Sequence, residues 1–212
     1  MVKTNQTRET IRETFVTGFS GIIKTTGYKK IFFSNWITFL PIIISVLFLI
    51  FTISFNEDEL KLLLEIKTLM LNFLPGILGF TIAGYSMMVA FIQAGMIEKI
   101  TEPSRGSKFS LYQKMSAILA INIMLQAIAL IIAYTFHFIN YFDSNKSIPN
   151  FLPSQYIAIV NYLGIVILSY WFSLSLLMVI QIILNIFGFS QLHHYFINKD
   201  KIERLETPES NS

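Results

Sequence analysis

The charged residues of this 212-residue chain are gathered into short segments and leave four long stretches without Asp, Glu, Lys or Arg. The stretches contain 26, 30, 28 and 52 residues and lie between Lys30 and Glu57, Lys67 and Glu98, Lys114 and Asp143, and Lys146 and Lys199. The hydrocarbon core of a bilayer is about 30 Å thick, and an α-helix needs about 20 apolar residues to cross it. Each stretch is therefore long enough to span a membrane.

The composition agrees with a membrane protein and argues against several other classes. Charged residues make up 14% of the chain, against about 25% in soluble domains. The net charge of +3 is not concentrated in one basic segment, so we expect neither a soluble enzyme nor direct nucleic-acid binding. The chain has no Cys, which excludes disulfides and thiolate catalysis and suits a bacterial inner membrane.

The sequence predicts an all-α polytopic membrane protein in three parts. These are a cytoplasmic amphipathic segment, a four-helix transmembrane domain and a hydrophilic cytoplasmic tail, in residues 1–35, 36–188 and 189–212. The predicted spans are residues 36–55, 73–97, 115–138 and 156–187. The last uncharged stretch has room for two spans, but it lacks Pro and turn clusters between residues 156 and 187, so one long span ending near Gly188 is favoured.

Two further helices are predicted outside these spans. Near the N-terminus, apolar residues recur at the spacing of one helix face, at Ile11, Phe15, Phe19 and Ile22. This amphipathic helix can lie among lipid headgroups or pack under its own bundle, and the sequence favours neither. Residues 57–72 also have helical periodicity, and Pro75 with Gly76 predicts a break or kink before the second span.

The second span carries a stripe of small residues, Gly79, Ala83, Ala90 and Ala94. Small residues at helical spacing let helix backbones approach closely in lipid, where association depends on packing. We therefore expect the second span to be the central packing helix. The alternative is that its glycines line a solvent path or form a hinge.

The distribution of basic residues predicts the orientation. If the four spans alternate in direction, 13 Lys and Arg fall on one side of the membrane and 3 on the other. By the positive-inside rule, both termini and the loop 98–114 face the cytoplasm.

The spans contain no Asp, Glu, Lys or Arg, and His137 lies near the end of the third span, so we do not expect proton-coupled transport or voltage sensing. No nucleophile motif is present either, so we expect no enzymatic activity. His193 and His194 are adjacent but have no third ligand nearby, so we expect no metal and no cofactor.

Neutral amides are the main polar groups inside the predicted spans. Asn122 and Gln126 share one face of the third span, and Gln181 and Asn185 share one face of the fourth. Amides at this depth form hydrogen bonds between helices or subunits. Alternatively, they line a polar pore.

The aromatic pair Tyr170 and Trp171 lies well inside the fourth span. Aromatic side chains with polar tips at that depth are expected to face protein more than lipid. Because four helices offer little interior, we expect a homo-oligomer of two to four copies, surrounded by membrane lipids.

The layout of the whole chain and the Pro-Gly-rich stretch from Leu74 to Tyr85 resemble the membrane component of the Kiwa anti-phage defence system. The resemblance implies a membrane sensor that detects phage at the envelope and works with a cytoplasmic DNA-binding defence protein. It transfers no functional residue to this chain.

Two hypotheses for function follow. The first is an oligomeric inner-membrane scaffold or sensor that reports to a cytoplasmic partner, for which Arg105 and Lys108 are the candidate docking residues. The second is a small homo-oligomeric ion channel or pore-forming effector built around the amides.

Overall fold

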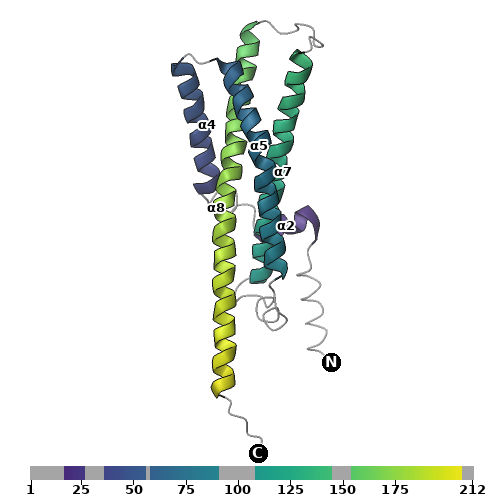
Figure 1. Ribbon diagram of the computed structural model, residues 1–212, viewed down its shortest axis with the longest axis vertical. Coiled ribbons are helices and arrows are strands. Elements are labelled where there is room, and N and C mark those ends of the chain that lie inside the picture. The colour runs from purple at the N-terminus through teal and green to yellow at the C-terminus, as the bar shows by residue number, and fades with distance from the viewer. Residues whose placement is uncertain (1–16, 27–35, 56–57, 91–107, 145–153, 207–212) are drawn as a thin grey trace, which may run out of the picture.

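The computed structural model describes residues 17–26, 36–55, 58–90, 108–144 and 154–206, and within them the chain is almost entirely helical (Figure 1). The helices are α2 (Gly18–Thr26), α4 (Trp36–Ser54), α5 (Glu59–Ala90), α7 (Leu111–Ser144) and α8 (Ser154–Glu206). The four longer helices are apolar enough and long enough to cross a membrane. The predicted fold class, an all-α protein with four candidate membrane spans, is confirmed.

Two of the long helices begin at side chains that satisfy free backbone N–H groups. At the start of α5, the Asp58 carboxylate accepts hydrogen bonds from the backbone N–H groups of Leu60 and Lys61, at 3.0 and 3.1 Å. At the start of α7, the Ser110 hydroxyl accepts from the Gln113 N–H at 3.1 Å, and the Gln113 side chain accepts from the Ser110 N–H at 3.0 Å. This reciprocal pair is a capping box, which fixes where α7 begins.

Helix α5 is longer than the predicted second span and has no break. It runs through Pro75 and Gly76 as one helix, so of the two alternatives expected there, a break or a kink, the break is wrong. Helix α5 therefore joins the amphipathic part of residues 57–72 directly to the apolar part that follows.

Helix α8 is the common packing partner of the three other long helices. It packs against α4, α5 and α7, whereas α4 packs mainly against α8 alone. The expectation that the second span is the central packing helix is therefore wrong, because α5 packs mainly against α7 and α8. Figure 1 shows α8 running beside α4 in its upper half, where α5 crosses it.

Helix α4 turns one narrow face inward. Ile37, Pro41, Ser45 and Thr52 recur at helical spacing and are buried. The Ser45 and Thr52 hydroxyls donate to carbonyl oxygens of their own helix, at 2.9 and 2.7 Å. Because their polar groups are satisfied locally, these small side chains can lie in a helix contact inside a membrane.

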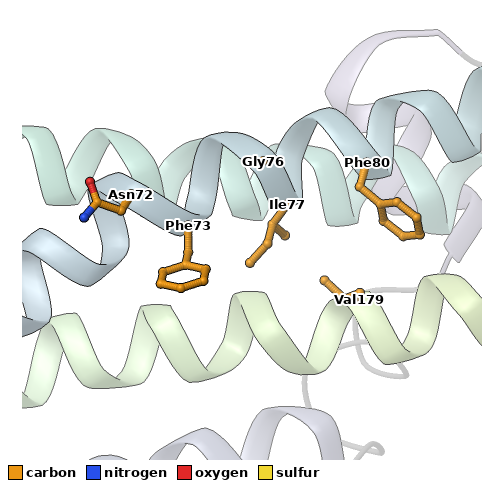
Figure 2. A pocket seen from close by; sticks show the side chains of 6 residues that line it. All are labelled: Asn72, Phe73, Gly76, Ile77, Phe80 and Val179. Carbon is orange, nitrogen blue, oxygen red and sulfur yellow. The ribbon is translucent and has the colours of Figure 1, made fainter.

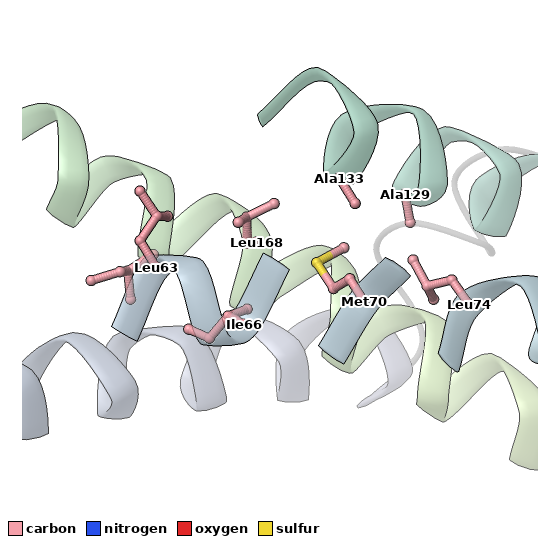
Figure 3. Close-up of a cluster of buried hydrophobic side chains, with 8 residues drawn as sticks. Leu63, Ile66, Met70, Leu74, Ala129, Ala133 and Leu168 are labelled. Carbon is pink, nitrogen blue, oxygen red and sulfur yellow. The ribbon is translucent and has the colours of Figure 1, made fainter. Parts of the chain in front are cut away.

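The main apolar cluster lies where α5, α7 and α8 meet (Figure 3). Met70 and Leu74 of α5 face Ala129 and Ala133 of α7, and all four are fully buried. Large side chains on one helix thus meet small ones on the other, which brings the two helices close together. A second cluster, centred on Met88, joins the same three helices nearer the start of α7.

Helix α8 continues as one helix of 53 residues from Ser154 to Glu206. The expectation of one long span in place of two is confirmed, but the helix does not end near Gly188. It passes through that glycine, and most of the predicted tail belongs to the helix. Figure 1 shows this part extending well past the ends of α5 and α7.

The described part of the N-terminal segment, α2, packs against α7. Gly21 and Thr25 are buried, while Phe19 is 59% exposed. Of the two alternatives for this segment, packing against its own bundle therefore holds for α2. Its Phe19 side chain is exposed and does not take part in that packing. The other expected apolar positions, Ile11 and Phe15, lie outside the described residues.

Candidate functional site: polar contacts between α5 and α7

The strongest polar feature inside the spans is a hydrogen bond between two helices. The Thr81 hydroxyl of α5 lies 2.8 Å from the Gln126 side-chain oxygen of α7, and both residues are fully buried. Gln126 was predicted to form a contact between helices, and the structure places it in one. Its partner Thr81 was missed, although it lies seven residues from Leu74 and from Met88, which pack inward on the same helix face.

A second polar contact joins the same helices closer to the start of α7. The hydroxyl oxygens of Tyr85 and Ser116 are 3.1 Å apart. Tyr85 lies one turn after Thr81, so the two contacts form a short polar line along the α5–α7 interface.

Asn122 lies on the same face of α7 as Gln126 and is 2% exposed. Its amide nitrogen and that of Gln126 have no hydrogen-bond partner among the described residues. A buried polar group without a partner costs about 1–3 kcal/mol, so these amides are the main unsatisfied polar groups of the site.

The Thr81 hydroxyl decides how the Gln126 amide is oriented. It has one proton but two acceptors within reach, the Ile77 carbonyl oxygen at 3.0 Å and the Gln126 side chain at 2.8 Å. If the Gln126 amide is turned over, its nitrogen donates to Thr81 while Thr81 donates to Ile77. That arrangement satisfies Thr81 fully and leaves one unpaired amide oxygen on Gln126 and one unpaired amide nitrogen on Asn122.

The amides of the fourth span do not belong to this site. Gln181 and Asn185 are half-buried on α8, and the Asn185 amide nitrogen has no partner among the described residues. The structure gives no hydrogen bond that would join them to Asn122 or Gln126.

The predicted small-residue stripe does not face the other helices of the chain. Gly79, Ala83 and Ala90 are exposed, and a Cβ added at Gly79 would meet no atom within 4 Å. Ala94 lies outside the described residues. The face that packs inward is a different one, with Met70, Leu74, Ile77, Thr81, Gly84 and Met88 at alternating steps of three and four residues.

Two glycines outside the predicted stripe are the sites of close approach. A Cβ at Gly84 of α5 would lie 2.9 Å from Ile186 Cδ1 of α8. A Cβ at Gly164 of α8 would lie 2.9 Å from Leu63 Cδ1 and 3.0 Å from Phe136 Cε1. A side chain at either position therefore meets a neighbouring side chain at once, and that neighbour must move to make room for it.

A shallow groove of about 420 Å³ lies between α5 and α8 (Figure 2). Its lining residues are Asn72, Phe73, Gly76, Ile77, Phe80 and Val179. Asn72 supplies the one polar side chain in this lining. The groove offers an apolar surface and no titratable group for chemistry.

The remaining predicted residues lie elsewhere. Lys108 is exposed just before α7, and Arg105 lies outside the described residues. Tyr170 and Trp171 pack against the helix core with ring centroids 5.8 Å apart in an edge-to-face arrangement, as expected for residues that face protein. No group of three His, Asp or Glu side chains that could hold a metal ion occurs in the described part of the chain.

Comparison with protein-family models, with curated proteins and with solved structures finds no match to this chain.

Proposed function

We propose that the chain is an oligomeric scaffold or sensor of the bacterial inner membrane, which couples an event in the membrane to a cytoplasmic partner. The observation that carries this proposal is the continuity of α8. Its residues up to Leu192 pack with α5 and α7, and the helix then continues to Glu206. The part beyond Leu192 is about 20 Å long at 1.5 Å per residue.

This geometry suits a coupling element. Because α8 contacts the three other spans, a change in the packing of any of them is passed to α8 by direct contact. A continuous helix transmits such a shift to its far end, which lies outside the bundle (Figure 1). In the most specific form of the proposal, which rests on the Kiwa resemblance, the membrane event is phage infection and the partner is a DNA-binding defence protein.

The docking part of the proposal is tested by co-purification. The tagged chain is isolated from cells after mild cross-linking, and the bound cytosolic proteins are quantified by mass spectrometry. The double variant R105E/K108E should lose the partner, because both changes reverse charge near the start of α7. The matched control is Lys61→Glu, which reverses an exposed charge at the other end of the bundle. Equal recovery with R105E/K108E and wild type would remove this docking surface.

The coupling part is tested by breaking α8. Gln191 is exposed near the end of the packed part of α8. A proline there removes one helix hydrogen bond and clashes with the carbonyl four residues earlier, at a cost of about 3 kcal/mol or more. Gln191→Pro should abolish protection in a phage plaque assay, whereas Gln191→Ala should keep it. Full protection by Gln191→Pro would refute transmission through α8.

The alternative function, a small homo-oligomeric channel, is weaker. Asn122 and Gln126 are buried against α5 of their own chain, which favours helix contact over the lining of a pore between copies. Current through planar bilayers containing the purified oligomer would support the channel. Light scattering in detergent measures the number of copies.

A further inference from the structure

The contact between α5 and α7 has a polar half and an apolar half. Near the start of α7, the facing residues are Tyr85 with Ser116 and Thr81 with Gln126. Further along α7, Met70 and Leu74 of α5 face Ala129 and Ala133 (Figure 3). The polarity of the interface therefore changes at Gln126.

The polar half contains more hydrogen-bonding groups than the described residues pair. With the Gln126 amide turned so that Thr81 is fully satisfied, an amide nitrogen on Asn122 and an amide oxygen on Gln126 remain, one helix turn apart. Asn122 is 2% exposed and Gln126 is 0% exposed, so bulk solvent does not reach them in this conformation. Buried polar groups in such a position are normally satisfied by ordered water.

We propose that ordered water occupies the polar half of the α5–α7 interface, bound between the Asn122 amide nitrogen and the Gln126 amide oxygen. One water molecule can accept from the first group and donate to the second, which closes the hydrogen-bond chain from Asn122 through Gln126 and Thr81 to the Ile77 carbonyl.

The polarity of the interface also sets the path of this water. Ser116 is half-buried, five residues after Leu111 begins α7, so the polar line approaches the surface at that end. At the other end, Ala129, Ala133, Met70 and Leu74 are fully buried and apolar. Water that enters from the end at which α7 begins has to pass Met88 and Leu119, which are buried in an apolar cluster at that end, and it stops at Gln126. The interface is a hydrated half-path and not a pore, and this inference does not depend on the proposed sensor function.

Single cysteines test the path, because the natural chain contains no Cys. A thiol reacts with a methanethiosulfonate reagent as the thiolate, which forms in water and not in a dry core. Ser116→Cys and Asn122→Cys are the test variants, and Ala129→Cys and Ala133→Cys on the same helix are the matched controls. A small charged reagent is applied separately to right-side-out and inside-out vesicles.

The test cysteines should react at least about tenfold faster than the controls, and from the α7-start side of the membrane only. No reaction at Ser116→Cys and Asn122→Cys would overturn the proposal. Equal reaction at all four positions would also overturn it, because it would mean an open pore or a loose bundle.

A measurement on the wild-type protein tests the proposal without any variant, so it does not depend on whether the cysteine variants fold. A density map from electron cryo-microscopy that resolves ordered water should show a peak within hydrogen-bond distance of the Asn122 amide. A map that resolves other buried waters but leaves this position empty would refute the bound water.

Discussion

Two glycines five residues apart on α5 should respond in opposite ways to the same substitution. Gly84 is buried, and an added Cβ would lie 2.9 Å from Ile186 Cδ1 and 3.9 Å from Ile182 Cγ2. Gly79 is exposed, and an added Cβ would meet nothing within 4 Å. Leucine at Gly84 must therefore push α5 and α8 apart, whereas leucine at Gly79 finds open space.

The magnitudes follow from these environments. Overpacking a buried contact costs about 1–3 kcal/mol, so Gly84→Leu should destabilise the bundle by that amount. Gly79→Leu removes backbone freedom from the unfolded chain and should stabilise the helix by about 0.5–1 kcal/mol. The two variants should thus differ by roughly 2.5 kcal/mol, which corresponds to about 5–10 °C in Tm for a chain of this size.

The assay is thermal unfolding of the purified protein in detergent, followed by tryptophan fluorescence, to which Trp36 and the core residue Trp171 contribute. Gly84→Ala gives an intermediate point, because the nearest atom is the mobile end of Ile186 and can move aside at little cost. The reasoning fails if Gly79→Leu lowers Tm as much as Gly84→Leu at an unchanged oligomeric state. If the exposed stripe packs against a second copy, Gly79→Leu should instead reduce the mass measured by light scattering.

Three further predictions concern hydrogen bonds, caps and orientation. A double-mutant cycle of Thr81→Val and Gln126→Leu should give a coupling energy of about 0.6–1.7 kcal/mol in detergent unfolding, and zero coupling would contradict the contact. Ser110→Ala should cost about 1 kcal/mol by removing the cap of α7, while Ser86→Ala on the exposed face of α5 should leave Tm unchanged; equal losses would argue against the capping box. Cysteines placed in each terminal segment and in the loop 98–114 should resist an impermeant reagent added to intact cells, and labelling of any of them would contradict the predicted orientation.

The sequence could predict the number of spans because placing a charged side chain inside the bilayer costs free energy. The gaps between charged residues locate the four long helices without any structural information. The sequence also identified Gln126 as a residue of a helix contact, because an amide at that depth needs a partner.

The sequence could not show which face of α5 packs inward. In a soluble helix, the apolar face marks the core, but lipid is as apolar as the protein interior, and from residue 73 onward both faces of α5 are apolar. Gly79 and Gly84 therefore look alike in the sequence, and only the positions of Ile182 and Ile186 on α8 distinguish them. The end of α8 was missed for a related reason: Gly188 often signals a helix end, but Lys199 with Glu203 and Asp200 with Arg204 are spaced to support further helix.

The dependence of α4 on α8 has a consequence for synthesis. About 100 residues separate Ser54, where α4 ends, from Ser154, where its main partner begins. At about 5–20 residues per second, a ribosome needs roughly 5–20 s to bridge that interval. Helix α4 must therefore stay in the bilayer without its main partner until α8 is synthesised, and its uncharged, strongly apolar sequence is stable there.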